Sequence, residues 1–179
     1  MIYLFVALKI EATPIINYYK LKKVKFNIFE NSQMKLLICG IGEKNFSLSC
    51  GELEISENDE VINFGICGSC TPNLQIGEMI NISKIQNDKI SFTLQNSPNL
   101  KNLTLQTFHN PVTKNINFSC DVVDMEGFVF YQIFQNLTNN IKIIKVVSDY
   151  LDTTIPKKNF IYGLINKKMA ILNEEIYGK

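Results

Sequence analysis

The sequence predicts an α/β fold, specifically a three-layer αβα sandwich with a central mixed, mainly parallel sheet. Short apolar runs rich in β-forming residues recur along the chain, as at Ile2–Leu8, Val61–Phe64 and Ile141–Val147, and such runs are typical of strands buried on both faces. Segments with helical spacing separate them, which favours βαβ units with helices on both faces of the sheet. Two adjacent runs, Gly77–Ile85 and Lys89–Leu94, indicate a pair of antiparallel strands in the middle.

The chain is expected to begin with the strand Ile2–Leu8. Pro14 fits the first turn of the following helix, which reaches about Leu21, because a first-turn residue needs no N–H donor. Glu11 would then lie in the loop between strand and helix. The apolar run Met34–Cys39 indicates the next buried strand.

Glycine-containing segments follow two of the expected strands. Gly40–Gly42 ends one apolar run before an expected helix at Lys44–Leu53, and Gly65–Ser69 follows the strand Val61–Phe64. Strand, glycine turn and helix is the order of a βα unit. Leu103–Phe108 alternates in polarity and is expected to be a further strand.

Carboxylates mark the ends of the last two expected strands. Asp124–Glu126 lie between an apolar segment and an expected helix at Gly127–Leu137, and Ser148–Asp149 follow the strand Ile141–Val147. Acidic residues before a helix either cap it or belong to a ligand site, and the pair alone does not decide between them. One amphipathic helix, Asn159–Ile176, is expected to close the chain.

The ends of the expected strands carry the side chains that suit a functional site. In a parallel sheet these ends share one edge, and ligands bind in the crevice outside it. We therefore expect a cleft where several carboxylates and two glycine turns converge, formed by Glu11, Gly40–Gly42, Gly65–Ser69, Asp124–Glu126 and Ser148–Asp149.

Composition limits the possible partners. The chain has 179 residues, 46% hydrophobic and 20% charged, with a net charge of +1, which favours one globular domain that binds neither nucleic acid nor a membrane. All 18 basic residues are lysine, so no guanidinium fork is available for phosphate. The first dozen residues contain Lys9 and Glu11 and lack a basic leader. We therefore expect no signal peptide, a cytoplasmic location and five reduced cysteines.

Two smaller features have several interpretations. Cys67 and Cys70 have the spacing of a redox motif, of half a zinc site and of a thiol protease segment, but the flanking residues of each of these sites are missing. Small residues packed in a close approach of backbone are the favoured interpretation. His109, the single histidine, lies in a polar loop and is expected at the surface rather than in catalysis.

Four segments in order together resemble the nucleoside phosphorylase and nucleosidase superfamily, and within it the methylthioadenosine/S-adenosylhomocysteine nucleosidases. The segments are Ala7–Glu11 (ALKIE), Val61–Ile80 (with FGICGS and LQIGE), Asp121–Glu126 (DVVDME) and Lys145–Asp149 (KVVSD), and Gly40–Gly42 matches a G-I-G segment of that family. The resemblance covers nearly the whole chain. It implies a single domain of the nucleoside phosphorylase-like fold over residues 1–179, a homodimer and no cofactor or metal.

The resemblance implies cleavage of the N-glycosidic bond of a purine nucleoside. Asp149 matches the general acid that protonates the leaving base, and Glu11 matches the base that orients the attacking water. By the same resemblance, Glu126 binds the ribose hydroxyls, Met125 packs on the sugar and Ser148 supports the acid. Phe108 lies against the base, Gly65 belongs to the glycine segment, and Lys145 supplies a cation.

Departures from the family pattern leave the substrate open. Lys145 stands where these nucleosidases have an arginine, and Ile66 stands where a hydroxyl residue is common. The segment between Ser83 and Asp121, which helps to form the base and 5′-substituent pockets, is short. Hydrolysis of methylthioadenosine or S-adenosylhomocysteine is the leading hypothesis. Phosphorolysis, hydrolysis of a futalosine-type nucleoside and a non-catalytic nucleoside-binding homologue are the alternatives.

Overall fold

The structure is a computed structural model that describes residues 1–51, 53–112, 118–151 and 156–178. Within these residues the strands are β1 (Ile2–Val6), β2 (Lys22–Lys25), β3 (Ile28–Glu30), β4 (Met34–Ile38), β5 (Glu60–Ser69), β6 (Met79–Gln86), β7 (Ser91–Thr93), β8 (Lys101–Thr107), β9 (Val122–Asp124) and β10 (Ile141–Asp149). The helices are α1 (Lys9–Tyr19), α2 (Glu43–Cys50), α3 (Gly127–Phe134), α4 (Lys158–Asn166) and α5 (Met169–Tyr177). Strands and helices alternate around β1, α1, α3 and β10, whereas β2 to β4 and β5 to β9 follow one another without an intervening helix.

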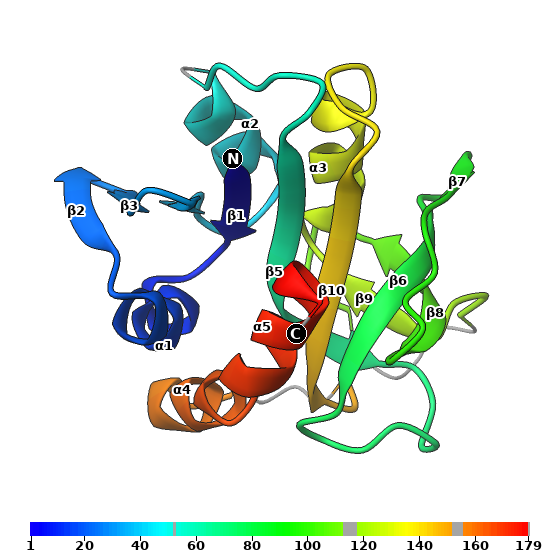
Figure 1. The fold of residues 1–179 in the computed structure, drawn as a ribbon. Coiled ribbons are helices and arrows are strands. Elements are labelled where there is room, and N and C mark those ends of the chain that lie inside the picture. Colours follow the sequence, from blue (N-terminus) through cyan, green and yellow to red (C-terminus); the bar gives the residue numbers. More distant parts are fainter. Residues whose placement is uncertain (52, 113–117, 152–155, 179) are drawn as a thin grey trace.

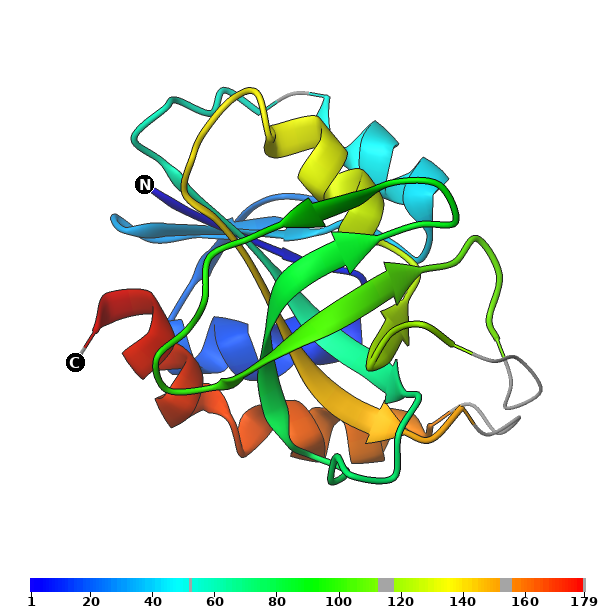
Figure 2. The same ribbon diagram turned by 90° about the vertical axis from the view of Figure 1, so that its right-hand side faces the viewer.

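The described strands form one mixed sheet whose middle closes on itself. The order is β10-β6-β8-β9-β5-β1-β4-β3-β2, with β7 on β6, and β10 pairs also with β5. Strands β5, β9, β8, β6 and β10 therefore form a barrel-like ring, which Figure 2 shows from the side of β6 and β8. Parallel and antiparallel pairings are equally frequent among the described strands. The sheet is thus mixed as expected, without a parallel majority, and the ring is not a feature of a flat sandwich.

Helices pack on both faces of the part of the sheet that contains β1, β4, β5 and β10 (Figure 1). On one face α2 and α3 cover a core that includes Phe5, Phe46 and Phe130. On the other face α1, α4 and α5 cover a core that includes Ile15 and Leu172. No helix in the described ranges combines the length and apolar character needed to cross a membrane.

Three expected element bounds are wrong, and each error has a physical reason. Helix α1 begins at Lys9, so Glu11 lies in its first turn rather than in a loop, and Pro14 lies inside the helix. Strand β5 continues through Gly65–Ser69, because β10 pairs with it as far as Gly68 and β9 pairs with Gly68 and Ser69. The C-terminal helix is two helices, α4 and α5, which are separated at Lys167 and Lys168.

Parallel pairing places the carboxyl ends of four strands side by side. Strand β1 pairs with β4 and β5, and β5 pairs with β10, all in parallel. Strand β9 runs antiparallel to β5, with Val123 opposite Gly68, so its carboxyl end at Asp124 points back along β5. The segments that follow β1, β4 and β9 therefore meet along the last half of β5.

Candidate active site

Glu11 connects the start of α1 to β5. Its side chain is buried, with the residue 2% exposed. Oε2 accepts a hydrogen bond from the backbone N–H of Leu8 (2.7 Å), and Oε1 accepts one from the N–H of Ile66 (2.9 Å). Burial raises the pKa of Glu11, although these N–H groups and the charge of Lys145 act in the opposite direction. The carboxylate is therefore held rigidly at the edge of the sheet.

Gly65 makes room for this carboxylate. A Cβ atom at position 65 would lie only 2.8 Å from Oε1 of Glu11, so any other residue would displace the carboxylate. Gly65 also pairs with Lys145 of β10, which places the cation at the same level of the sheet. The close approach of Glu11 to the backbone thus explains the glycine.

Asp124 and Lys145 form a buried ion pair. Oδ2 of Asp124 lies 2.7 Å from Nζ of Lys145, and the side chains are 3% and 2% exposed. Asp124 also accepts hydrogen bonds from the N–H of Gly127 (2.9 Å) and from Oγ1 of Thr107 (2.6 Å). Thr107 in turn accepts a bond from the N–H of Phe128. Asp124 is therefore both a cap at the start of α3 and the counter-charge of Lys145, and both interpretations of the acidic pair apply to it.

Glu126 lies between this ion pair and the start of α2. Its Oε1 accepts a hydrogen bond from the N–H of Gly42 at 2.6 Å. Burial and the negative charge of Asp124 raise the pKa of Glu126 to about 7, against the opposing influence of Lys145. Burial by itself lowers the pKa of Lys145, but Asp124 and Glu126 outweigh burial and the pKa is raised. Lys145 thus stays charged, and Glu126 is the carboxylate that can gain or lose a proton near neutral pH.

Ser148 and Asp149 are the last two residues of β10. Oγ of Ser148 lies 2.6 Å from Oδ2 of Asp149 and 3.1 Å from the carbonyl oxygen of Cys67, while Oδ1 of Asp149 accepts a bond from the N–H of Leu151 (2.9 Å). A serine hydroxyl has one hydrogen, and the shorter contact is its bond to Asp149. Ser148 and the N–H of Leu151 therefore hold the Asp149 carboxyl group in place at the end of β10.

Asp149 lies farther along β5 than the carboxylates of Glu11 and Glu126. Lys145 pairs with Gly65 and Asp149 pairs with Gly68, and three residues of a strand span about 10 Å. The Cys67 thiol lies between these positions. Burial raises the pKa of Cys67, the charge of Lys145 lowers it, and the charges of Asp124 and Asp149 raise it. The arrangement separates the Asp149 carboxyl group at one end from Glu11, Asp124 and Glu126 at the other.

Two expected site residues lie next to this group. Phe108 follows β8, and its N–H donates to the carbonyl oxygen of Asp124 (2.9 Å), while its ring contacts Phe118 with centroids 6.0 Å apart. Met125 is half-buried between Asp124 and Glu126. Asp152, which extends the KVVSD match, lies outside the described residues.

Sequence reasoning missed two groups that position the carboxylates. Gly42 was expected as part of a glycine turn, but the hydrogen bond from its N–H to Glu126 was not expected. The hydroxyl of Thr107 had no assigned role. A polar residue at the end of β8, next to the end of β9, is the signal that could have indicated Thr107, because these two strands pair there.

His109 and the Cys67–Cys70 segment are not part of the carboxylate group. The side chain of His109 is 81% exposed and its Nδ1 lies 3.0 Å from Oε2 of Glu43, which confirms the expected surface position. Cys67 is buried within β5, and Cys70 lies nearest to Cys120, with the two Sγ atoms 3.6 Å apart.

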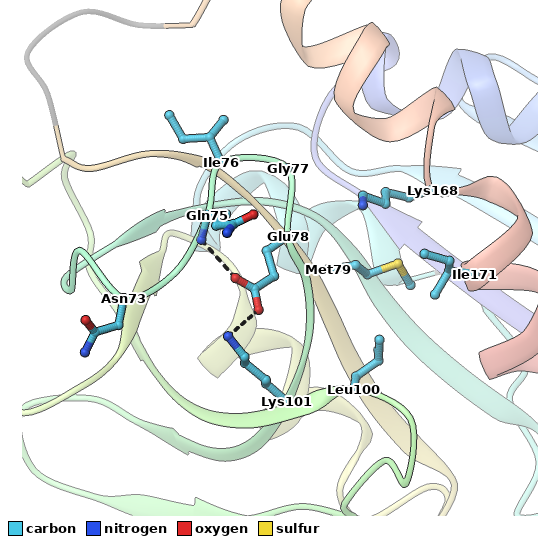
Figure 3. A pocket seen from close by; sticks show the side chains of 10 residues that line it. All are labelled: Asn73, Gln75, Ile76, Gly77, Glu78, Met79, Leu100, Lys101, Lys168 and Ile171. Carbon is cyan, nitrogen blue, oxygen red and sulfur yellow. Dashed lines mark hydrogen bonds and ion pairs between the residues drawn. The ribbon is translucent and has the colours of Figure 1, made fainter.

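A cavity of about 450 Å³ lies elsewhere, beside the segment that leads into β6. The Glu78 carboxylate in this cavity is already bound. It pairs with Lys101 at 2.6 Å and accepts a hydrogen bond from the N–H of Gln75, as Figure 3 shows. Apolar side chains such as Met79 and Ile171 complete its lining. The cavity lacks the buried carboxylates that chemistry at a glycosidic bond requires, so we assign the candidate active site to the carboxylate group at the end of the sheet.

The fold is that of methylthioadenosine/S-adenosylhomocysteine nucleosidases. No protein-family profile and no curated protein sequence matches the chain. Among solved structures, the enzyme from Chlamydia trachomatis bound to methylthioadenosine has a TM-score of 0.84 at 20% identity, covering 99% of this chain and 97% of that one. The same protein bound to adenine has a TM-score of 0.81 at 21% identity, with the same coverage. The Helicobacter pylori enzyme with butyl-thio-DADMe-Immucillin-A has a TM-score of 0.82 at 15% identity, covering 99% and 98%.

Proposed function

We propose that this protein hydrolyses the N-glycosidic bond of a purine nucleoside, with methylthioadenosine or S-adenosylhomocysteine as substrate. The observation that carries the proposal is the group of buried carboxylates at Glu11 and Glu126, which surrounds Lys145 and lies on the same sheet segment as Asp149. Solved structures with this fold hold methylthioadenosine or adenine, which are a substrate and a product of such a reaction.

The mechanism assigns a separate task to each end of the site. Asp149 gives its proton to the base as the bond between base and sugar breaks, and the bond from the Ser148 hydroxyl keeps the Asp149 carboxyl group in position. The positive charge that develops on the ribose is stabilised by the carboxylates of Glu11 and Glu126. Glu11, fixed by two backbone N–H groups, orients a water molecule and accepts its proton as the water attacks the sugar.

The substrate contacts follow from the same arrangement. Glu126 accepts hydrogen bonds from the ribose hydroxyls, with Met125 packed on the sugar and the Phe108 ring against the base. Gly65 contributes through Glu11, because the Glu11 carboxylate fills the space that a Cβ atom at position 65 would take. Lys145 acts through its charge, because Asp124 already occupies its ammonium group.

Hydrolysis is favoured over phosphorolysis by the position of Lys145. A phosphorylase must bind a phosphate dianion, and Lys145 is buried and paired with Asp124 at 2.7 Å. Glu11 and Glu126 would repel the dianion further. A futalosine-type nucleoside remains the second candidate substrate, since the short segment between β7 and β9 forms part of the expected pocket for the 5′-substituent.

Release of free adenine from methylthioadenosine, measured by chromatography with and without phosphate, tests the proposal. We expect adenine and methylthioribose in equal amounts at the same rate in both conditions. Strict dependence on phosphate would replace hydrolysis with phosphorolysis. Nucleoside binding without any adenine release would instead support a non-catalytic homologue. We further propose a cytoplasmic homodimer in which residues 1–179 form one domain.

A further inference from the structure

Cys70 and Cys120 form a pair of thiols that the proposed reaction does not use. Their Sγ atoms lie 3.6 Å apart, although the residues are 50 positions apart in sequence. Both thiols are free and partly exposed. Cys67, the neighbour that the sequence motif pairs with Cys70, is buried in β5. The spatial partner of Cys70 is thus a cysteine that no sequence motif indicates.

Backbone hydrogen bonds hold the two segments in place. Ser69 pairs with Val122 in the β5–β9 ladder, and the N–H of Cys70 continues it by donating to the carbonyl oxygen of Asp121 (2.9 Å). The Asp121 carboxylate accepts a bond from the N–H of Thr104 on β8 (2.8 Å). A disulfide needs the sulfur atoms about 2.05 Å apart, so each sulfur must move by less than about 1 Å. Side-chain rotation can supply this movement while the ladder stays intact.

We propose that Cys70 and Cys120 are a dithiol modification site, which low-molecular-weight disulfides such as oxidised glutathione convert into one intramolecular disulfide. The thiolate of one of the two cysteines attacks the glutathione disulfide, which forms a mixed disulfide and releases one glutathione thiolate. The thiolate of the other cysteine then attacks the protein sulfur of the mixed disulfide and releases the second glutathione thiolate. Two protein thiols are oxidised, one glutathione disulfide is reduced to two thiols, and the two protein protons pass to the leaving thiolates.

The contact between the two thiols is a hydrogen bond in which either sulfur can be the donor. The sulfur that accepts this bond is stabilised as a thiolate and attacks first. The other thiol then resolves the mixed disulfide, so either cysteine can take either part.

The remaining cysteines are out of reach of an oxidant in the folded protein. Cys39, Cys50 and Cys67 are all buried, at 3%, 9% and 3% exposed. Cys39 and Cys50 contact each other by a thiol hydrogen bond, so they would be the competing bridge if the fold opened. Mapping of the bridge therefore distinguishes oxidation of the folded protein from oxidation of an unfolded one.

Oxidised glutathione added to the full chain, followed by alkylation, non-reducing peptide mapping and thermal unfolding, tests the site. We expect loss of two of the five thiols, one bridged peptide joining Cys70 and Cys120, a rise in Tm of several degrees and full reversal by a reductant. Cys70→Ser and Cys120→Ser should each accumulate a glutathione adduct on the remaining thiol, because no second thiol is left to resolve it, with neither variant showing the rise in Tm.

Three results would overturn the proposal. These are a bridge between Cys39 and Cys50, unchanged thiol content in the oxidised wild type, or a Cys70→Ser protein that forms no adduct although its reduced Tm matches the wild type. The assay follows mass and Tm rather than nucleoside cleavage, so its outcome is independent of the proposed function.

Discussion

At the scale of single residues, the candidate site is a problem of charge balance. Three buried carboxylates, Glu11, Asp124 and Glu126, share one buried ammonium group, Lys145. Asp124 takes the direct contact, so the other two carboxylates are left without a cation of their own and their pKa values rise. A site with three buried carboxylates and one buried ammonium group is suited to proton transfer and to stabilising a cationic sugar.

Glu126 should make the stability of the protein depend on pH. Its pKa is about 7 in the folded protein against an ordinary 4.5, so the folded state binds more protons between these values and stability falls as the pH rises from 4.5 to 7. The loss is at most about 3 kcal/mol. Glu126→Gln keeps an acceptor for the N–H of Gly42 and removes the titration. Urea unfolding of both proteins at several pH values measures the difference, and parallel curves would refute it.

Asp149→Asn should abolish turnover while leaving nucleoside binding largely intact. The amide cannot deliver a proton to the base, and loss of a general acid costs about 10²–10⁴-fold in kcat. Asp88→Asn is a matched control, because Asp88 lies in the β6–β7 turn and only accepts a bond from Gln106. Steady-state kinetics and calorimetric binding measure the two effects. A near wild-type kcat would remove Asp149 from the mechanism.

The Asp124–Lys145 pair should show strong coupling in unfolding experiments. Lys145→Met leaves the Asp124 carboxylate buried without a counter-charge, which costs about 3–5 kcal/mol. Combining it with Asp124→Asn should recover at least half of that loss. Lys142→Met on the same strand removes the partly exposed pair with Glu60 and a bond to the carbonyl oxygen of Glu175, and it should cost only about 1 kcal/mol. Urea unfolding measures these free energies. If the losses of the two single variants simply add up in the double variant, Asp124 and Lys145 are not energetically coupled.

At the scale of elements, β5 organises the site. Its last half contacts Glu11 at Gly65 and Ile66, pairs with β10 at Lys145 and Asp149, and pairs with β9 at Gly68. A sequence with glycines at positions 65 and 68 looks like a turn, because glycine weakens a strand. In the structure both glycines serve close approaches of other side chains, and the partner strands maintain the extended backbone. The sequence pattern therefore located the segment but not its conformation.

Gly65→Ala tests the close approach at β5. The added methyl group would lie 2.8 Å from Oε1 of Glu11 and should force the carboxylate from its bonds to Leu8 and Ile66. Displacement by about 1 Å can cost on the order of 10²-fold in rate. Gly163→Ala is the control, because a Cβ at this helical position meets nothing within 4 Å. Nucleoside cleavage by both variants is the measurement, and equal activity would show that Glu11 does not need its present position.

At the scale of the whole molecule, the order of strands and helices could be predicted, while the closure of the sheet could not. Apolar runs identified β1, β4, β6 and β10 because burial on both faces leaves a clear signal. The pairing of β10 with both β5 and β6 depends on contacts between distant segments, which periodicity does not encode. The same limit applies to the site. Glu11, Glu126 and Asp149 were found at strand ends, but the contact of Asp124 with Lys145 needed the register of three strands.

The exposed apolar side chains bear on the proposed homodimer. Leu48 on α2 is 74% exposed and Ile41, just before α2, is 49% exposed. Ile41 precedes Gly42, whose N–H binds Glu126, and α2 begins directly after Gly42. A partner subunit covering this surface would exclude water beside the carboxylates. Light scattering should give twice the chain mass of 20.5 kDa. Leu48→Glu should shift it to the monomer, whereas Phe26→Ser, which alters an 84% exposed side chain on the β2–β3 hairpin, should not. A monomeric wild type would refute the dimer, and a Leu48→Glu dimer would move the interface elsewhere.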